Sequence, residues 1–115
     1  MDLNSIHEFD AILPDVPFRR SYVEIAGEIW KMVPYENIKP MYLSNYGRIR
    51  NHKNTPIKAS FKRNRKYARI IYTSGQTTTM PLDRLMMVTF MDKDKGNIIH
   101  IDGDTSNNDL TNLTF

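Results

Sequence analysis

Residues 98–113 contain the side chains in this sequence that are best suited to chemistry. His100 lies in the apolar run Ile98–Ile101, and Asp102 and Gly103, a pair typical of tight turns, follow that run. In the hydrolysis of a phosphodiester, an imidazole can remove the proton of the attacking water while an amide orients it through its other ring nitrogen. We therefore take His100 as a candidate general base and Asn108 as the candidate side chain that orients it.

The same residues also have a purely structural interpretation. Asp, Asn and Gly are frequent in turns because they tolerate unusual backbone conformations, and Asp and Asn also hydrogen-bond to the nearby backbone. His100 is then a residue of the turn, and the asparagines that stabilise the hairpin backbone are Asn107, Asn108 and Asn112. For the asparagines the structural interpretation is favoured, whereas for His100 both stay open.

Short strands and one helix are predicted to position this stretch. β-Branched and aromatic residues between turn-forming residues predict strands at 29–33, 41–45, 48–50, 56–61, 67–73 and 98–101, and a Thr-rich strand that ends at Met80. Apolar residues at helical spacing from Leu82 to Phe90, directly after Pro81, predict an amphipathic helix. We therefore expect an α+β fold, a small domain of short antiparallel strands with one helix. Trp30 is expected in its interior.

Charge is unevenly distributed along the chain, although the formal net charge is only +3. Residues 37–82 contain ten Lys and Arg and no Asp or Glu, whereas residues 1–36 and 83–115 are net acidic. Such a basic segment is typical of proteins that bind a phosphate backbone; the alternative is a solvated face that pairs with the acidic ends. The candidate nucleic-acid contacts lie on the predicted strands and on a predicted basic loop at 62–66: Arg48, Arg50, Lys62, Arg63, Arg65, Lys66 and Arg69.

Composition excludes several other classes of protein. The absence of cysteine excludes a disulfide scaffold, a zinc knuckle and a cysteine nucleophile. No apolar run approaches the length of a membrane span, and the N-terminus lacks the features of a secretory signal. We therefore expect a protein of a reducing compartment with no membrane partner.

Three motifs, in the same order along the chain, resemble those of the HNH (His-Me finger) homing endonucleases of phages. The residues that match the HNH motif after His100 are Asp102, Gly103, Asn107, Asn108, Asn112 and Leu113. The segments that resemble the NUMOD4 module, which commonly precedes that motif, are Glu28–Lys31, Tyr35–Glu36 and Tyr42–Arg50. The residues that resemble the family's intervening helix are Arg84, Leu85 and Phe90. The resemblance covers residues 27–115.

The resemblance implies that the fold ends in a partial ββα-metal hairpin. It divides the chain into an N-terminal extension at 1–20, a NUMOD4-like module at 21–54 and a partial HNH-like domain at 55–115. In the extension, apolar residues at helical spacing predict a helix that ends before Pro14. The resemblance further implies double-stranded DNA as the partner, magnesium as the cofactor of any remaining nuclease activity, and a cytoplasmic location in the host of a phage or mobile element.

Three departures from the family pattern bear on catalysis. Ile99 stands where the family has an Asp or Asn that binds the metal, and an apolar side chain cannot bind a hard cation. The family's last metal ligand lies on a helix after the HNH strands, whereas this chain ends at Phe115. Asp83 stands where the family often has His. We therefore expect any role of His100 as a base to be vestigial and the chain to hold no metal or other cofactor.

Two functional hypotheses follow. In the first, the chain is a DNA-binding protein of the HNH homing-endonuclease family whose metal-dependent DNA nicking is weak or lost. In the alternative, a phage or mobile element has kept the fold as a non-catalytic binding protein that inhibits or redirects a host or rival protein machine. Binding to duplex DNA at two salt concentrations discriminates between them. Phosphate contacts release counterions, so an affinity that depends on them falls as the salt concentration rises.

Overall fold

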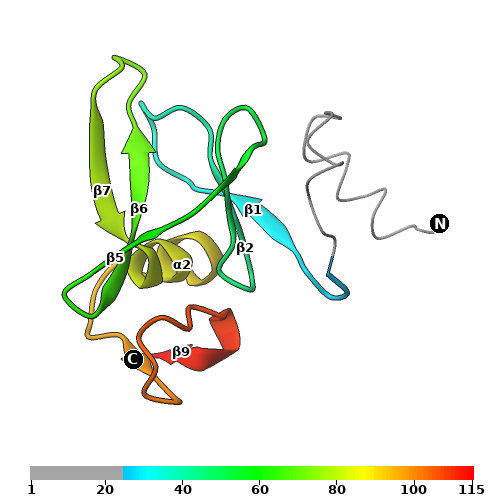
Figure 1. The fold of residues 1–115 in the computed structure, drawn as a ribbon, viewed down its shortest axis with the longest axis vertical. Coiled ribbons are helices and arrows are strands. Elements are labelled where there is room, and N and C mark those ends of the chain that lie inside the picture. The colour runs from blue at the N-terminus through cyan, green and yellow to red at the C-terminus, as the bar shows by residue number, and fades with distance from the viewer. Residues whose placement is uncertain (1–24) are drawn as a thin grey trace.

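The computed structural model describes residues 25–115, and within that range the chain has an α+β fold, as predicted. Three antiparallel sheets and one α-helix make up the described part (Figure 1). The predicted extension at 1–20, with its predicted helix, lies outside the described residues. No helix in the described range is long and apolar enough to cross a membrane.

The first sheet has four antiparallel strands that follow one another in sequence order. They are β1 (Trp30–Met32), β2 (Tyr42–Ser44), β3 (Ile49–Arg50) and β4 (Pro56–Ile57). The first three confirm the strands predicted there, with slightly shorter bounds. In the turn between β2 and β3, Gly47 has a φ of +84°, and an added Cβ would lie 3.0 Å from the carbonyl oxygen of Asn108. The turn therefore requires glycine both for its backbone conformation and for its contact with the C-terminal loop.

The second sheet has three strands, and here the structure differs from the prediction in two ways. Its strands are β5 (Ser60–Lys62), β6 (Arg65–Ile71) and β7 (Thr77–Pro81). The prediction of one strand at 56–61 is wrong, because the chain crosses between sheets after Ile57, so that β4 pairs with β3 and β5 with β6. The predicted loop at 62–66 is too long: Arg63 and Asn64 alone form the turn, both at positive φ, as in the tightest hairpins.

One hydrophobic cluster joins the helix α2 (Leu82–Met91) to both larger sheets. Leu85 and Met86 of the helix pack in it with Leu43 of the first sheet and Ile70 of the second. The helix begins directly after Pro81, a residue that has no N–H to leave unpaired at a helix end. Because the cluster draws on both sheets, the predicted module boundary between residues 54 and 55 falls within a shared core and within the first sheet.

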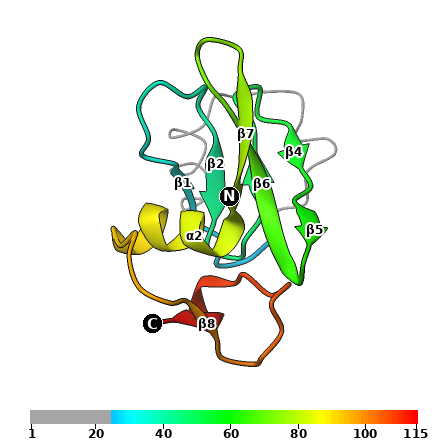
Figure 2. The ribbon, with the colours of Figure 1, turned by 90° about the vertical axis from the view of Figure 1, so that its left-hand side faces the viewer.

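The third sheet lies below α2 in both views of the ribbon (Figures 1 and 2). It pairs β8 (Ile99–His100) with β9 (Leu113–Thr114), and the short 3-10 helix η2 (Leu110–Asn112) precedes β9. The strand predicted at 98–101 is confirmed in its central residues. The backbone N–H of Leu110 donates to the carbonyl oxygen of Asn45 at 2.8 Å. His100 therefore lies on a small sheet that both α2 and the turn after β2 support.

Candidate functional site

Asp102 organises the loop between β8 and β9. Its Oδ1 accepts hydrogen bonds from the backbone N–H of Asp104 at 2.8 Å and from Nδ2 of Asn112 at 2.9 Å, and its Oδ2 accepts one from Nδ2 of Asn107 at 2.8 Å. The hydrogen bond from Asn107 is the main cause that holds the pKa of Asp102 below its usual range. Asn107 and Asn112 therefore stabilise the hairpin, as the structural interpretation predicts.

His100 lies beside Asn108, the residue predicted to orient it. His100 Nε2 and Asn108 Oδ1 are 3.1 Å apart, and both side chains are almost fully buried. In the tautomer that carries its hydrogen on Nε2, the imidazole donates to this oxygen, because an amide oxygen only accepts hydrogen bonds. The structure thus brings together the candidate base and its candidate orienting amide, and their catalytic role stays a prediction.

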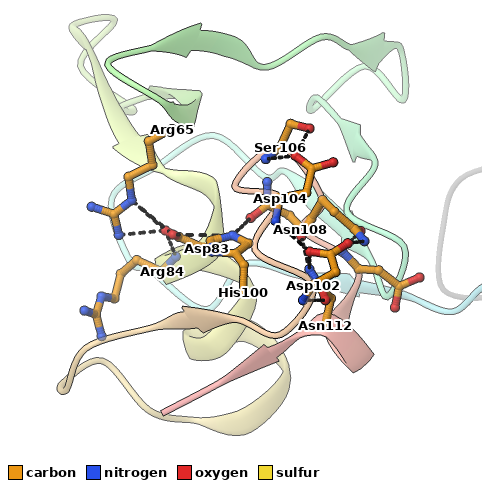
Figure 3. A network of polar contacts seen from close by, with 11 residues as sticks. Arg65, Asp83, Arg84, His100, Asp102, Asp104, Ser106, Asn108 and Asn112 are labelled. Carbon is orange, nitrogen blue, oxygen red and sulfur yellow. Dashed lines mark hydrogen bonds and ion pairs between the residues drawn. The ribbon is translucent and has the colours of Figure 1, made fainter.

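Asp83 also lies near His100, although it is not among the predicted site residues. It belongs to the first turn of α2, its side chain is 4% exposed, and its Oδ2 is 3.9 Å from His100 Nε2 (Figure 3). Arg65 of β6 donates to both carboxylate oxygens, from Nε at 3.0 and 3.1 Å and from Nη2 at 2.7 Å. These hydrogen bonds are the main cause that raises the pKa of Arg65.

The sequence contains little that points to Asp83 as a site residue. Acidic residues are common in the first turn of a helix because they interact favourably with its dipole. Asp83 therefore has an ordinary local explanation, and the signal in the sequence was its departure from the family's usual His. Its proximity to His100 and Arg65 depends on how α2, β6 and β8 pack together.

The residues around His100 do not fit a divalent metal site. Ile99, at the position where the resemblance implies a ligand, is apolar and about half exposed. The carboxylates of Asp83 and Asp102 already accept hydrogen bonds from arginine and amide groups. Within residues 25–115, no three His, Asp or Glu side chains gather where they could hold one ion. Hard cations require several oxygen ligands, so no catalytic step through a metal follows from this donor set.

Arg48 and Arg50, two of the predicted nucleic-acid contacts, are engaged within the protein. Arg48 Nε donates to Glu28 Oε2 at 2.7 Å. Arg50 is 1% exposed, and its guanidinium carbon lies 4.1 Å from the centre of the Trp30 ring. Guanidinium groups stack favourably on indole faces, so Arg50 belongs to the interior, and its burial removes it from the candidate DNA surface. Trp30 is buried, as predicted.

The remaining predicted contacts lie on the hairpin of β5 and β6. Lys62 and Arg63 are exposed at its tip, and Arg69 is exposed further along β6. Lys66 is half-buried, and Arg65 turns toward Asp83. Three cations therefore stand exposed on this hairpin, and their contact with nucleic acid stays a prediction.

Comparison with known proteins concerns the fold. No protein-family model and no curated protein matches the chain. Among solved structures, the chain is similar to that of the HNH homing endonuclease I-HmuI, which binds and cleaves DNA, with a TM-score of 0.57 and 21% sequence identity; the match covers 73% of this chain and 49% of that chain. This chain therefore spans about half the length of that structure. The NUMOD4-like assignment stays a prediction. At this identity the likeness concerns the fold alone, and the chain has an HNH-like α+β fold.

Proposed function

We propose that this chain binds double-stranded DNA and that its metal-dependent nicking activity is weak or lost. The observation that carries the proposal is the likeness of its fold to that of an endonuclease that binds and cleaves DNA. The segment 37–82, which contains no carboxylate, forms most of the two larger sheets in this fold. The fold and the charge thus support the same partner, although they are independent observations.

The outer face of the second sheet is the surface that we propose for the DNA contact. Lys62, Arg63, Tyr67 and Thr79 line a hollow there. Arg69 is exposed on the same sheet, directly opposite Thr79 in the register of β6 and β7. Cations attract phosphates, and the hydroxyl groups of Thr and Tyr donate hydrogen bonds to phosphate oxygens. Such a surface positions a duplex without reading its sequence.

The weakness of the proposed nicking activity follows from the residues beside His100. In-line attack on a phosphodiester develops negative charge that a metal normally neutralises. Ile99 offers no ligand, and the nearby cation, Arg65, is held by Asp83. A general base alone contributes about 10²–10⁴-fold, whereas electrostatic stabilisation contributes several kcal/mol at roughly tenfold for each 1.4 kcal/mol. The chain is therefore proposed to hold no resident metal or other cofactor, and the resemblance implies magnesium only for any nicking activity that remains.

The DNA contact is tested by binding of a labelled duplex at about 50 mM and about 200 mM salt, an interval over which phosphate contacts weaken strongly. The variant combines Lys62→Gln, Arg63→Gln and Arg69→Gln. Its matched control combines Lys31→Gln, Lys93→Gln and Lys95→Gln, which removes three exposed cations outside residues 37–82. If each of the first three contacts a phosphate, the salt slope falls by about 2.7 in the variant only. Absent or salt-independent binding contradicts the proposal and favours the non-catalytic protein-binding alternative.

The nicking activity is tested with a supercoiled plasmid and magnesium or manganese. Wild type, His100→Ala and Ile99→Asp are compared, and all three are expected to nick slowly or not at all. Restoring a carboxylate in Ile99→Asp supplies one ligand, which is too few to hold a hard cation. Rapid nicking by the wild type that disappears in His100→Ala would show that the chain is a working endonuclease.

A further inference from the structure

Two side-chain oxygens lie near the same nitrogen of His100. Asn108 Oδ1 lies 3.1 Å and Asp83 Oδ2 lies 3.9 Å from Nε2. The side chains of His100 and Asp83 are 7% and 4% exposed, so little water reaches the space between them. Figure 3 shows Arg65, Asp83, His100 and Asn108 as one connected series from β6 to the C-terminal loop.

We propose that Asp83 is a positioning residue for His100. Together with Asn108, it holds the imidazole in the tautomer that carries its hydrogen on Nε2. A neutral imidazole has one N–H and one bare nitrogen, and a bare Nε2 would turn its lone pair toward two oxygen atoms. Nδ1 is then the ring nitrogen that is left to accept a proton. The use of Nδ1 on DNA rests on the proposed function, whereas the tautomer does not.

The position of the Asp83 carboxylate beside the imidazole is fixed by hydrogen bonds from two other residues. Arg65 binds both of its oxygens, and the backbone N–H of Arg84 donates to Oδ1 at 2.7 Å. A bidentate guanidinium–carboxylate pair restricts the plane of the carboxylate as well as its position. Arg65 lies on β6 and His100 on β8, so Asp83 joins the second sheet to the candidate base.

The competing explanation is that Asp83 only ties α2 to β6 through Arg65. On that explanation, the imidazole would be fixed by Asn108 alone, and removing the Asp83 charge would leave the tautomer unchanged. The tautomer is therefore the property that separates a positioning role from a structural one. It is read from the side-chain ¹⁵N shifts of His100, since the N–H nitrogen and the bare nitrogen resonate far apart.

The experiment records these shifts on the whole chain at a pH of about 9, well above the ordinary pKa of a free imidazole, about 6.5. The test variant is Asp83→Asn and the matched control is Asp92→Asn, an exposed position at the end of α2 whose left-handed backbone Asn tolerates. We expect the Nε2–H tautomer to dominate in the wild type and in the control. In Asp83→Asn, the ratio of Nε2–H to Nδ1–H is expected to fall several-fold. A wild type dominated by Nδ1–H, or an unchanged ratio in Asp83→Asn, overturns the proposal.

A second variant decides the question if Asp83→Asn does not fold. Asn108→Ala removes the other acceptor and leaves Asp83 and Arg65 in place. The proposal expects Nε2–H to remain the major tautomer in this variant, because Asp83 still faces that nitrogen. Loss of the preference would show that Asn108 acts alone and would overturn the proposal. None of these measurements uses DNA, so their failure is distinct from failure of the proposed function.

Discussion

Arg50 and Arg63 belong to the same basic segment, yet they lie in opposite environments. Arg50 is buried in the first sheet against Trp30, whereas Arg63 is exposed at the turn between β5 and β6. The residue type and the surrounding sequence charge are the same in both regions. The difference shows that a carboxylate-free segment can supply interior packing in one sheet and exposed charge in the next.

The register of the first sheet explains why Arg50 is enclosed. Side chains alternate between the two faces of a strand, and residues paired across strands share a face. Trp30 pairs with Ser44, and Tyr42 pairs with Arg50, so all four lie on one face of the sheet. Leu43 points to the opposite face and joins the hydrophobic cluster. Arg50 therefore covers the second face of the sheet by stacking on the indole of Trp30.

The largest expected difference between the buried and the exposed cations is in their contribution to the stability of the fold. Arg50→Ala is expected to lower the free energy of unfolding by about 2–5 kcal/mol, the range for truncation of a buried Leu, Ile or Met to alanine, because Arg50 is buried as fully as the hydrophobic core. Lys62→Ala, which removes a cation from the exposed hairpin, is expected to change it by less than about 0.5 kcal/mol. Urea unfolding of both variants measures the difference. Equal effects would mean that Arg50 is as dispensable to the fold as a surface cation.

The next largest effect on stability is expected in the turn between β2 and β3, which contacts the hairpin that carries His100. Gly47 and Gly103 have φ of +84° and +75°, so alanine at either position costs about 1–2 kcal/mol for its backbone. An added Cβ at Gly47 also approaches the Asn108 carbonyl oxygen at 3.0 Å, whereas Gly103 has nothing within 4 Å. Gly47→Ala is therefore expected to be the more destabilising of the two in urea unfolding. The reverse order would contradict a tight contact between these regions.

Much of the fold was predictable because its elements have local sequence patterns. The helix after Pro81 and the strands β1, β2 and β3 follow from apolar spacing and turn residues. The division of residues 56–61 between two sheets has no local pattern, since it depends on which strand each half pairs with. Arg63 at positive φ was missed for a related reason, because arginine is not a typical residue of such turns.

The candidate site likewise has one part that the sequence predicts and one part that it does not. His100 and Asn108 are eight residues apart within one hairpin, so a single motif contains both. Asp83 and Arg65 are 18 residues apart, and Asp83 meets both Arg65 and His100 only when the helix packs against two different sheets. The burial of Arg50 likewise requires the register of three strands. Properties of these residues that arise from tertiary packing leave no trace in sequence spacing.

On the proposed function, a smaller effect is expected on DNA affinity when an exposed arginine and a paired arginine are substituted in turn. Arg63→Gln removes an exposed cation and should reduce the salt slope of duplex binding by about 0.9, or roughly three- to fourfold in affinity between about 50 and 200 mM salt. Arg48→Gln should leave the slope unchanged, because Arg48 is paired with Glu28. Fluorescence anisotropy with one duplex measures both. An equal fall of the salt slope in the two variants would show that Arg48 contacts DNA despite its ion pair with Glu28.

The smallest expected effect is on the pH dependence of stability, and it separates two aspartates of the acidic segment 83–115. Asp102 accepts hydrogen bonds that stabilise its loop, whereas Asp92 is exposed at the end of α2. The pKa of Asp102 is held low, chiefly by the hydrogen bond from Asn107, so folding is favoured by its ionised form. A depressed folded-state pKa contributes stability above the unfolded value, about 3.9, and that stability is lost as the pH falls through the folded value.

Below a pH of about 4, therefore, the wild type should lose stability in part because the folded loop resists protonation of Asp102. Asp102→Asn has no carboxylate there, so its free energy of unfolding should be lower at neutral pH and should fall less steeply with acid. Asp92→Asn should keep the acid dependence of the wild type. Urea unfolding at a series of pH values measures the three slopes. If Asp92→Asn flattens the acid slope as much as Asp102→Asn does, the hydrogen bonds of Asp102 are not what stabilises the hairpin.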